Sequence, residues 1–266
     1  MRRGPALIGW LAAPFLLACN PAAAAAFPPA DGESSSGRAD SRSSEAQNRL
    51  VAAALDGNVE RVENLLRAGV PATARDSRMT ALEAAAGNGH VEVWRLLVQA
   101  GALRGADREL VNHLAEAATV LGNPEILRDL QPLHFDPNGP EPDPLIINVV
   151  SSAGGGSLSD RLELLHVLLA AGADPNRTNE SGVGALLLVR DIEMARLLLD
   201  AGIDVNQRNS VNETAAILLP ADQEDLALYY LDRGLDPSIR SEFGRTLADR
   251  ARADGWQRVL TRLHER

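Results

Sequence analysis

The stretch "TALEAAAGNGHVEVWRLLVQAGA", residues 80–102, decides how this 266-residue chain folds. An Ala-rich run stops at Gly89, and an amphipathic segment begins directly after it and stops at a second glycine, Gly101. Glycine readily adopts the left-handed backbone that closes a helix. The stretch therefore predicts two helices joined by a tight turn and followed by a loop that starts with glycine.

The same arrangement recurs along the chain. Apolar pairs stand three and four positions before five loop glycines, which are Gly69, Gly101, Gly172, Gly202 and Gly234. The spacings are 32, 71, 30 and 32 residues, and 71 corresponds to about two periods plus an insertion. The glycine turn between two helices recurs at Gly57, Gly89, Gly122 and Gly255. Helical units with this period predict a stack that buries its core between neighbours.

The ankyrin repeat pattern, "T-x-L-x-x-A-x-x-x-G-x-x-x-x-x-x-x-L-L-x-x-G-A", is similar to Thr80–Ala102 at nearly every position. "GADPN" at 172–176 and "GIDVN" at 202–206 resemble the loop of that family. The resemblance covers about residues 45–266. It implies an all-α fold, an ankyrin-repeat helix-turn-helix solenoid of about six to seven units. Units begin near 45, 79, 110, 144, 182, 213 and 245. Tetratricopeptide-like repeats are the alternative, but they lack a glycine-led loop with Asp and Asn between units.

Departures from the family pattern predict an irregular middle. Glu83 stands where the Thr-Pro-Leu-His tetrapeptide of the family has its histidine. Unit three loses its loop motif and continues into a Pro-rich excursion, 131–144. Unit four has a long insertion, 151–160, between its helices, and unit five has a shortened first helix. We expect a break in cooperativity between units two and four.

The N-terminus has the features of an export signal. Arg2 and Arg3 precede an apolar run that ends at Ala18, and this run is shorter than the roughly 20 residues that span a bilayer. The segment that follows is rich in Ala, Pro, Ser and Gly, which favours a flexible tether. The predicted organisation is a signal peptide at 1–18, a disordered tether at 19–44 and the repeat domain at 45–266.

Cys19 is the single cysteine of the chain, so it forms no internal disulfide. Leu16-Leu17-Ala18-Cys19 resembles the lipobox of bacterial lipoproteins, and the resemblance implies acylation of Cys19. The protein would then be lipid-anchored in the bacterial cell envelope and face the periplasm, with the outer membrane favoured because Asn20 follows the cysteine. The alternative is ordinary cleavage in the alanines before Phe27, which gives a soluble periplasmic or secreted protein.

Composition and motifs exclude several chemistries. A net charge of −10 disfavours nucleic acid and anionic lipid surfaces as partners. All 26 basic residues are arginine, which excludes a Schiff-base lysine and the P-loop lysine. The glycine-rich run at 153–160 is interpreted as a loop in which Ser159 or Asp160 caps a helix. The five histidines share no metal-binding spacing. We expect no catalytic residue, metal, cofactor or small-molecule substrate.

Arginine recurs at one position of the loops. The sixth residue after the loop glycine is Arg75, Arg208 or Arg240, and Arg177 lies one position earlier in its unit. Such a ladder suits bidentate capture of carboxylates on a partner. The neighbours Asp76, Asn179, Asn209 and Glu242 are candidate contacts or turn formers. The alternative is that exposed loop tips are simply polar and that arginine is the only basic residue in use.

The predicted function is a non-enzymatic protein–protein interaction module, tethered to a membrane in the periplasm, that scaffolds or protects an envelope partner. Two alternatives remain open. One is an immunity-type inhibitor of a toxin that acts in the periplasm, and the other is an enzyme of unrecognised type. The sequence leaves the identity of the protein partner open, because repeat scaffolds place specificity in variable surface residues.

Overall fold

The computed structural model describes residues 35–139, 144–151 and 155–265 of the chain. The unit that carries the fold spans Arg42–Arg266. Within the described residues it is built from helices, and the β-type pairing consists of isolated bridges in the loops, such as Arg75 with Thr80. None of the described helices is both long and apolar enough to cross a membrane.

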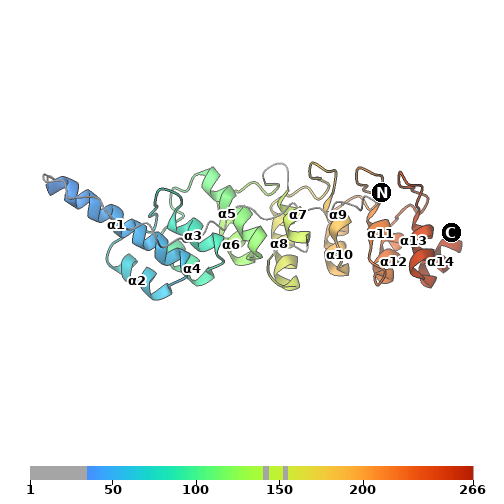
Figure 1. The fold of residues 1–266 in the computed structure, drawn as a ribbon, viewed down its shortest axis with the longest axis horizontal. Helices are drawn as coiled ribbons and strands as arrows, with labels where there is room; N and C mark the ends of the chain where they lie inside the picture. Colours follow the sequence, from blue (N-terminus) through green and yellow to red (C-terminus); the bar gives the residue numbers. More distant parts are fainter. Residues whose placement is uncertain (1–34, 140–143, 152–154, 266) are drawn as a thin grey trace, which may run out of the picture. The chain divides into compact units, whose positions relative to one another are not determined.

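The described helices form seven helix–turn–helix pairs that follow one another in chain order (Figure 1). The first helices are α1 (Ser35–Leu55), α3 (Ala81–Gly87), α5 (Arg108–Leu121), α7 (Leu145–Val150), α9 (Ala185–Leu188), α11 (Ala215–Leu218) and α13 (Leu247–Asp254). The second helices are α2 (Val59–Arg67), α4 (Val91–Gln99), α6 (Pro124–Leu130), α8 (Leu158–Ala170), α10 (Ile192–Asp200), α12 (Glu224–Asp232) and α14 (Gln257–His264). A single 3₁₀ turn, η1 (Gln131–Leu133), follows α6.

Neighbouring pairs pack first helix on first helix and second helix on second helix. Contacts run from α3 through α5, α7, α9 and α11 to α13, and in the second row from α2 through α4, α6 and α8 to α10. The apolar pairs before the loop glycines face this core, because Leu97, Leu168 and Leu198 are fully buried. Burial of one such side chain stabilises the stack by about 1.5–3 kcal/mol. The helical stack predicted from the sequence is therefore the fold observed.

Polar caps fix where several helices begin. A hydroxyl accepts a hydrogen bond from the third helical amide, and the carboxylate at that position accepts one in return. Such boxes pair Thr80 with Glu83, Ser157 with Asp160 and Thr246 with Asp249. Glu83, which replaces the histidine of the family pattern, therefore closes a capping box. The sequence suggests Ser159 or Asp160 as the cap of α8, and this was wrong, since Ser157 is the cap.

Two first helices are only four residues long. The short α9 was predicted, and it ends where Arg190 donates hydrogen bonds to the carbonyl oxygens of Leu187 and Val189. The short α11 was not predicted. Its end follows from Pro220, because a residue before proline avoids the helical region and Leu219 is extended. The 3₁₀ turn, the six-residue α7 and the long α7–α8 connection add the irregular middle that the sequence predicts.

The third unit keeps its loop motif, which corrects the prediction that it is lost. His134 has a φ of 56° and occupies the left-handed position held by glycine elsewhere. Phe135 is buried, like Ala173 at the equivalent position of the next loop. The "DPN" at 136–138 also matches the "DPN" at 174–176. The glycine search missed this loop because its left-handed residue is a histidine. The spacing of 71 residues thus contains one more loop at His134.

Asparagines in these motifs join successive loops. The side-chain oxygen of Asn138 accepts a hydrogen bond from the amide of Asp174, at 2.9 Å. In the same way, the side-chain oxygen of Asn176 accepts a hydrogen bond from the amide of Asp204, and that of Asn206 accepts one from the amide of Asp236. The asparagine of one unit therefore holds the loop of the next unit. The sequence signal is the D-x-N triplet, whose role between units was not recognised.

Helix α1 begins at Ser35, inside the segment 19–44 that the sequence predicts to be a tether. Its second half is anchored by buried residues such as Leu50 and Val51. Pro29 is the last proline before this helix, and once a helix is nucleated each added residue gains a hydrogen bond. The signal peptide, Cys19 and the tether up to residue 34 lie outside the described residues, so the boundaries at 18 and 44 stay predictions.

The His134→Gly substitution tests the corrected loop assignment. A side chain in the left-handed region is strained, whereas glycine loses more backbone entropy on folding, so we expect a net gain of about 0.5–1 kcal/mol in the free energy of unfolding. Urea unfolding followed by circular dichroism measures it. The control His113→Gly, on the exposed side of α5, should instead lose about 0.5 kcal/mol. A loss of stability in His134→Gly would show that the histidine is needed there.

Candidate functional site

The residues next to the predicted arginine ladder shape the loop tips. Asp76 accepts hydrogen bonds from the amides of Arg78 and Met79, at 2.7 and 2.8 Å. Asn179 accepts from Ser181 and Val183, and Asn209 from Val211 and Glu213. Each side chain thus closes a tight turn in its own loop. Of the two interpretations of Asp76, Asn179 and Asn209, the structure supports turn formation.

Glu242 has a different role from these three residues. Ser241 occupies the turn-forming position of its loop and accepts from the amide of Arg245. The side chain of Glu242 is exposed, and its backbone amide donates to the carbonyl oxygen of Val211 in the preceding loop, at 3.0 Å. Of the four neighbours, Glu242 is therefore the one whose side chain accepts no hydrogen bond from a turn amide in the described part of the chain.

Three arginines of the ladder are exposed at the loop tips. Nη1 of Arg208 donates to Asn212 Oδ1, at 3.0 Å, and Nη1 of Arg240 donates to the carbonyl oxygen of Gly244, at 3.3 Å. The side-chain amide of Asn212 also donates to the carbonyl oxygen of Arg240. Asn212 therefore links the Arg208 side chain to the backbone of Arg240, a link that sequence reasoning missed.

The ladder is not continuous along the described loops. At the sixth position after the loop glycine, Asp107 follows Arg75, and Asp107 caps α5. Thr178 holds that position in the fourth unit, where it bridges to Gly184 as Arg208 bridges to Thr214. Arg177 is one residue earlier, and neighbouring side chains of an extended backbone point to opposite sides. The arrangement consists of two adjacent rungs, Arg208 and Arg240, and one distant rung, Arg75.

Several arginines in the row of second helices are neutralised by carboxylates of neighbouring units. The pairs between second helices, with Arg233 at the end of α12, are Arg95–Glu125, Arg128–Glu163, Arg233–Asp200, Arg258–Glu224, Arg258–Asp225 and Arg262–Asp232. In the described part of the chain, Arg75, Arg208 and Arg240 form no ion pair. Their guanidinium charges are available to carboxylates from another molecule.

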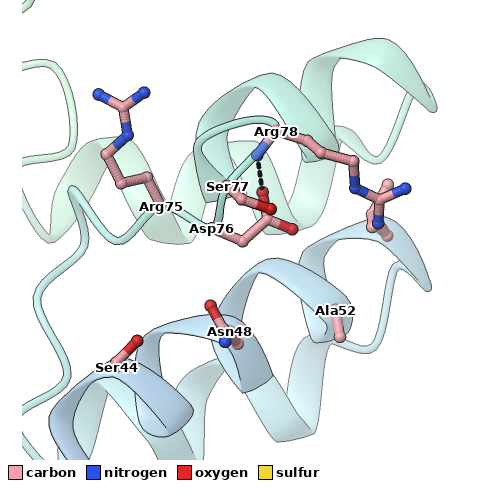
Figure 2. A pocket seen from close by; sticks show the side chains of 8 residues that line it. Ser44, Asn48, Ala52, Arg75, Asp76, Ser77 and Arg78 are labelled. Atoms are coloured by element: carbon pink, nitrogen blue, oxygen red, sulfur yellow. Dashed lines mark hydrogen bonds between the residues drawn. The ribbon is translucent and has the colours of Figure 1, made fainter. Parts of the chain in front are cut away.

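An open hollow of about 650 Å³ lies beside Arg75, between α1 and the first loop (Figure 2). One face of α1 contributes Ser44, Asn48, Ala52 and Leu55, and the loop contributes residues 75–78. Arg75 and Arg78 extend on opposite sides of Asp76 (Figure 2). Two cations with a hydroxyl and an amide nearby can bind acidic groups.

The carboxyl of Asp76 is held ionised in this hollow. Partial burial favours its neutral form, but hydrogen bonds from the Met79 and Arg78 amides and the charge of Arg78 outweigh burial. The pKa of Asp76 therefore lies below its ordinary value. Asp76 acts as a fixed anion that orients the loop.

A second hollow, of about 590 Å³, lies between α10 and α12 and includes Arg190, Ile192 and Tyr229. Nη1 of Arg190 donates to the carbonyl oxygens of Leu187 and Val189, at 3.0 and 2.7 Å. Because this guanidinium already closes the end of α9, its hydrogen bonds serve the fold.

Histidine is used for packing between units. Nε2 of His90 lies 3.0 Å from the carbonyl oxygen of Leu55, which links the α3–α4 turn to the end of α1. Among the described residues, no three His, Cys, Asp or Glu side chains are grouped to hold a metal ion.

Comparisons with known proteins identify the fold. The family model described as "Ankyrin repeat" matches residues 77–113. Among solved structures, the ankyrin repeat domain of Bcl-3, a member of the IkappaB protein family, matches with a TM-score of 0.56 and 22% identity, over 80% of this chain and 97% of that one. The curated proteins contain no match to the sequence. The predicted all-α ankyrin-repeat fold is confirmed, and such repeats indicate a protein–protein interaction module.

Acid should weaken this fold through carboxyls in caps and turns. The hydroxyl and then the amide of Thr246 stabilise the carboxylate of Asp249, so its pKa lies below the ordinary 3.8. A pKa depressed in the folded state adds stability above the unfolded value, and this stability is lost as pH falls through the folded value. We expect Asp249→Asn to be less stable than the parent chain at pH 7 and to approach it below pH 3.8.

Urea unfolding at pH 7 and at lower pH measures this difference. Asp222→Asn is the matched control, because its exposed carboxyl makes no hydrogen bond or ion pair within the described ranges. An Asp249→Asn difference that stays constant with pH would contradict the assignment.

Proposed function

We propose that this chain is a non-enzymatic module that recognises a partner protein while tethered to a membrane in the bacterial periplasm. The observation that carries the proposal is the contrast between two sets of arginines. Those between second helices are paired with carboxylates of this chain, whereas Arg75, Arg208 and Arg240 form no ion pair in its described part. Charges at the tips of a packed scaffold favour recognition of an acidic partner surface.

Rigid loops support this role. The tips of the fifth and sixth inter-unit loops are tied together by Asn212 and by the amide of Glu242, and the loops are joined lower down by Asn206. A surface that is already ordered loses less conformational entropy on binding. The arginines therefore lie on a pre-organised surface.

Membrane tethering rests on the sequence around Cys19. Acylation would anchor the chain in the envelope, with the outer membrane favoured by Asn20. A single acyl chain binds membranes only marginally, and stable anchorage takes two or more. The partner is then a protein of the envelope that the module scaffolds or protects.

Charge reversal at the adjacent rungs tests recognition. Arg208→Glu combined with Arg240→Glu should reduce partner recovered by affinity capture from envelope extract by at least tenfold, since both cations become repulsive to carboxylates. The matched control is Arg61→Glu with Arg108→Glu, which makes the same charge change in the first turns of α2 and α5, where Glu is tolerated. Mass spectrometry quantifies the partner. Equal recovery from both double variants would argue against the tips.

Membrane attachment is tested separately. In cells, the parent chain should partition into the detergent phase and Cys19→Ser should move to the aqueous phase, because the acylated thiol is lost. Mass spectrometry of the mature N-terminus reports where the signal is cleaved. A Cys19→Ser chain that stays with membranes, or cleavage within the following alanines, would refute the anchor.

A further inference from the structure

The last inter-unit loop exposes an aromatic side chain. Phe243 is 70% exposed, more than any other large apolar side chain in the described residues. Phe135, the other phenylalanine of the described part, is 5% exposed. The corresponding tip residues of the two preceding loops are Ser181 and Val211. Among the described residues, such an exposed phenylalanine stands out, because the chain has only 3% aromatic residues and Phe135 is buried.

The loop around Phe243 is braced. The amide of Ser241 donates to the carbonyl oxygen of Arg245 and the amide of Gly244 to that of Ser241, both at 2.9 Å, so residues 241–245 form a closed turn. Gly244 is left-handed, with a φ of 74°, as this turn requires. Arg245 forms an ion pair with Glu213, whose side chain is 8% exposed. Phe243 is therefore held out by an ordered loop.

One cation lies against the Phe243 ring, and a second is bound to the same turn. The guanidinium of Arg245 lies 5.8 Å from the centre of the Phe243 ring, within range for a cation–π contact. Arg240 donates to the carbonyl oxygen of Gly244, the residue after Phe243, and Asn212 connects Arg240 to Arg208. Arg245 is neutralised by Glu213, but Arg208 and Arg240 have no ion-pair partner among the described residues. The surface thus joins one aromatic anchor to two unneutralised cations.

We propose that Phe243, Arg240 and Arg208 form a docking surface for a segment of a partner protein in which a carboxylate lies next to an apolar side chain. The inference rests on the proposed function and names the partner chemistry of that site. Aromatic and arginine side chains dominate the binding energy of protein interfaces. The apolar side chain covers the Phe243 ring, and the carboxylate accepts hydrogen bonds from Arg240 and Arg208. Charge complementarity selects an acidic segment.

Synthetic peptides provide the probe. An array of 12-residue acetylated and amidated peptides would carry Glu or Asp next to Leu or Phe in a Gly-Ser background. The array is incubated with the full chain. Matched peptides replace the acid by its amide or the apolar residue by Ser. We expect binding to require both groups and to weaken with added salt. Binding without dependence on either group, or preference for a single-stranded oligonucleotide, would overturn the proposal.

Variants locate the contact. Phe243→Ala and Arg240→Gln should each weaken binding of the selected peptides at least tenfold. Val120→Ala, which removes an apolar side chain that is 45% exposed on α5, should leave binding unchanged. Because Phe243 is exposed, Phe243→Ala should keep the thermal midpoint and helical signal of the parent chain. Equal affinity of Phe243→Ala and the parent would overturn the docking surface.

The same variant separates this inference from the proposed function. In affinity capture from envelope extract, a partner that depends on Arg208 and Arg240 but is retained by Phe243→Ala would leave the function standing and refute the docking surface. Equal partner recovery from the arginine variants, from Phe243→Ala and from the parent chain would refute both the proposed function and the docking surface.

Discussion

The structure depends on a constraint that every repeat shares: a single helix pair has no partner for its apolar side within itself and must bury it against the next pair. Contacts accordingly run from first helix to first helix and from second helix to second helix. The loops also depend on their neighbours. The side-chain oxygen of each of three asparagines accepts a hydrogen bond from the amide of an Asp in the next unit; these are Asn138, Asn176 and Asn206. Because these bonds set one loop against another, they also set how Arg208 and Arg240 lie.

This constraint divides the surface into two electrostatic regions. Neighbouring second helices place arginines and acids of adjacent units side by side, and the pairs Arg95–Glu125 and Arg262–Asp232 are typical. Exposed pairs of this kind add little stability each, but they neutralise charge. At the loop tips, Arg208 and Arg240 form no ion pair with a carboxylate of the described part, although the charge of Arg240 acts on the Asp249 carboxyl of the next unit. A chain of net charge −10 can therefore present local cations to an acidic partner.

Sequence reasoning found the elements that follow from period and glycine. The stacked helices and the short α9 were predicted from residue spacing, since helix ends and tight turns are encoded locally. It failed where another residue type stands at the position expected for glycine. His134 takes a backbone conformation usually left to glycine, so the third loop was overlooked. The sequence did not predict the role of Asn212, because the carbonyl oxygen that accepts its hydrogen bond belongs to Arg240, one repeat away. Contacts of that range depend on how units stack, which the spacing alone does not fix.

The same reasoning explains why recognition is assigned to a loop. Many helix positions in the described part of the chain are committed, because apolar residues fill the core, and caps and ion pairs occupy helix ends and part of the outer surface. Asp76, Asn179 and Asn209 are committed too, since their side chains close the turns. Phe243 fills no core position, caps no helix and closes no turn. A residue whose exposure the fold does not require, on a loop that the fold does hold rigid, is best explained by a surface that a partner covers.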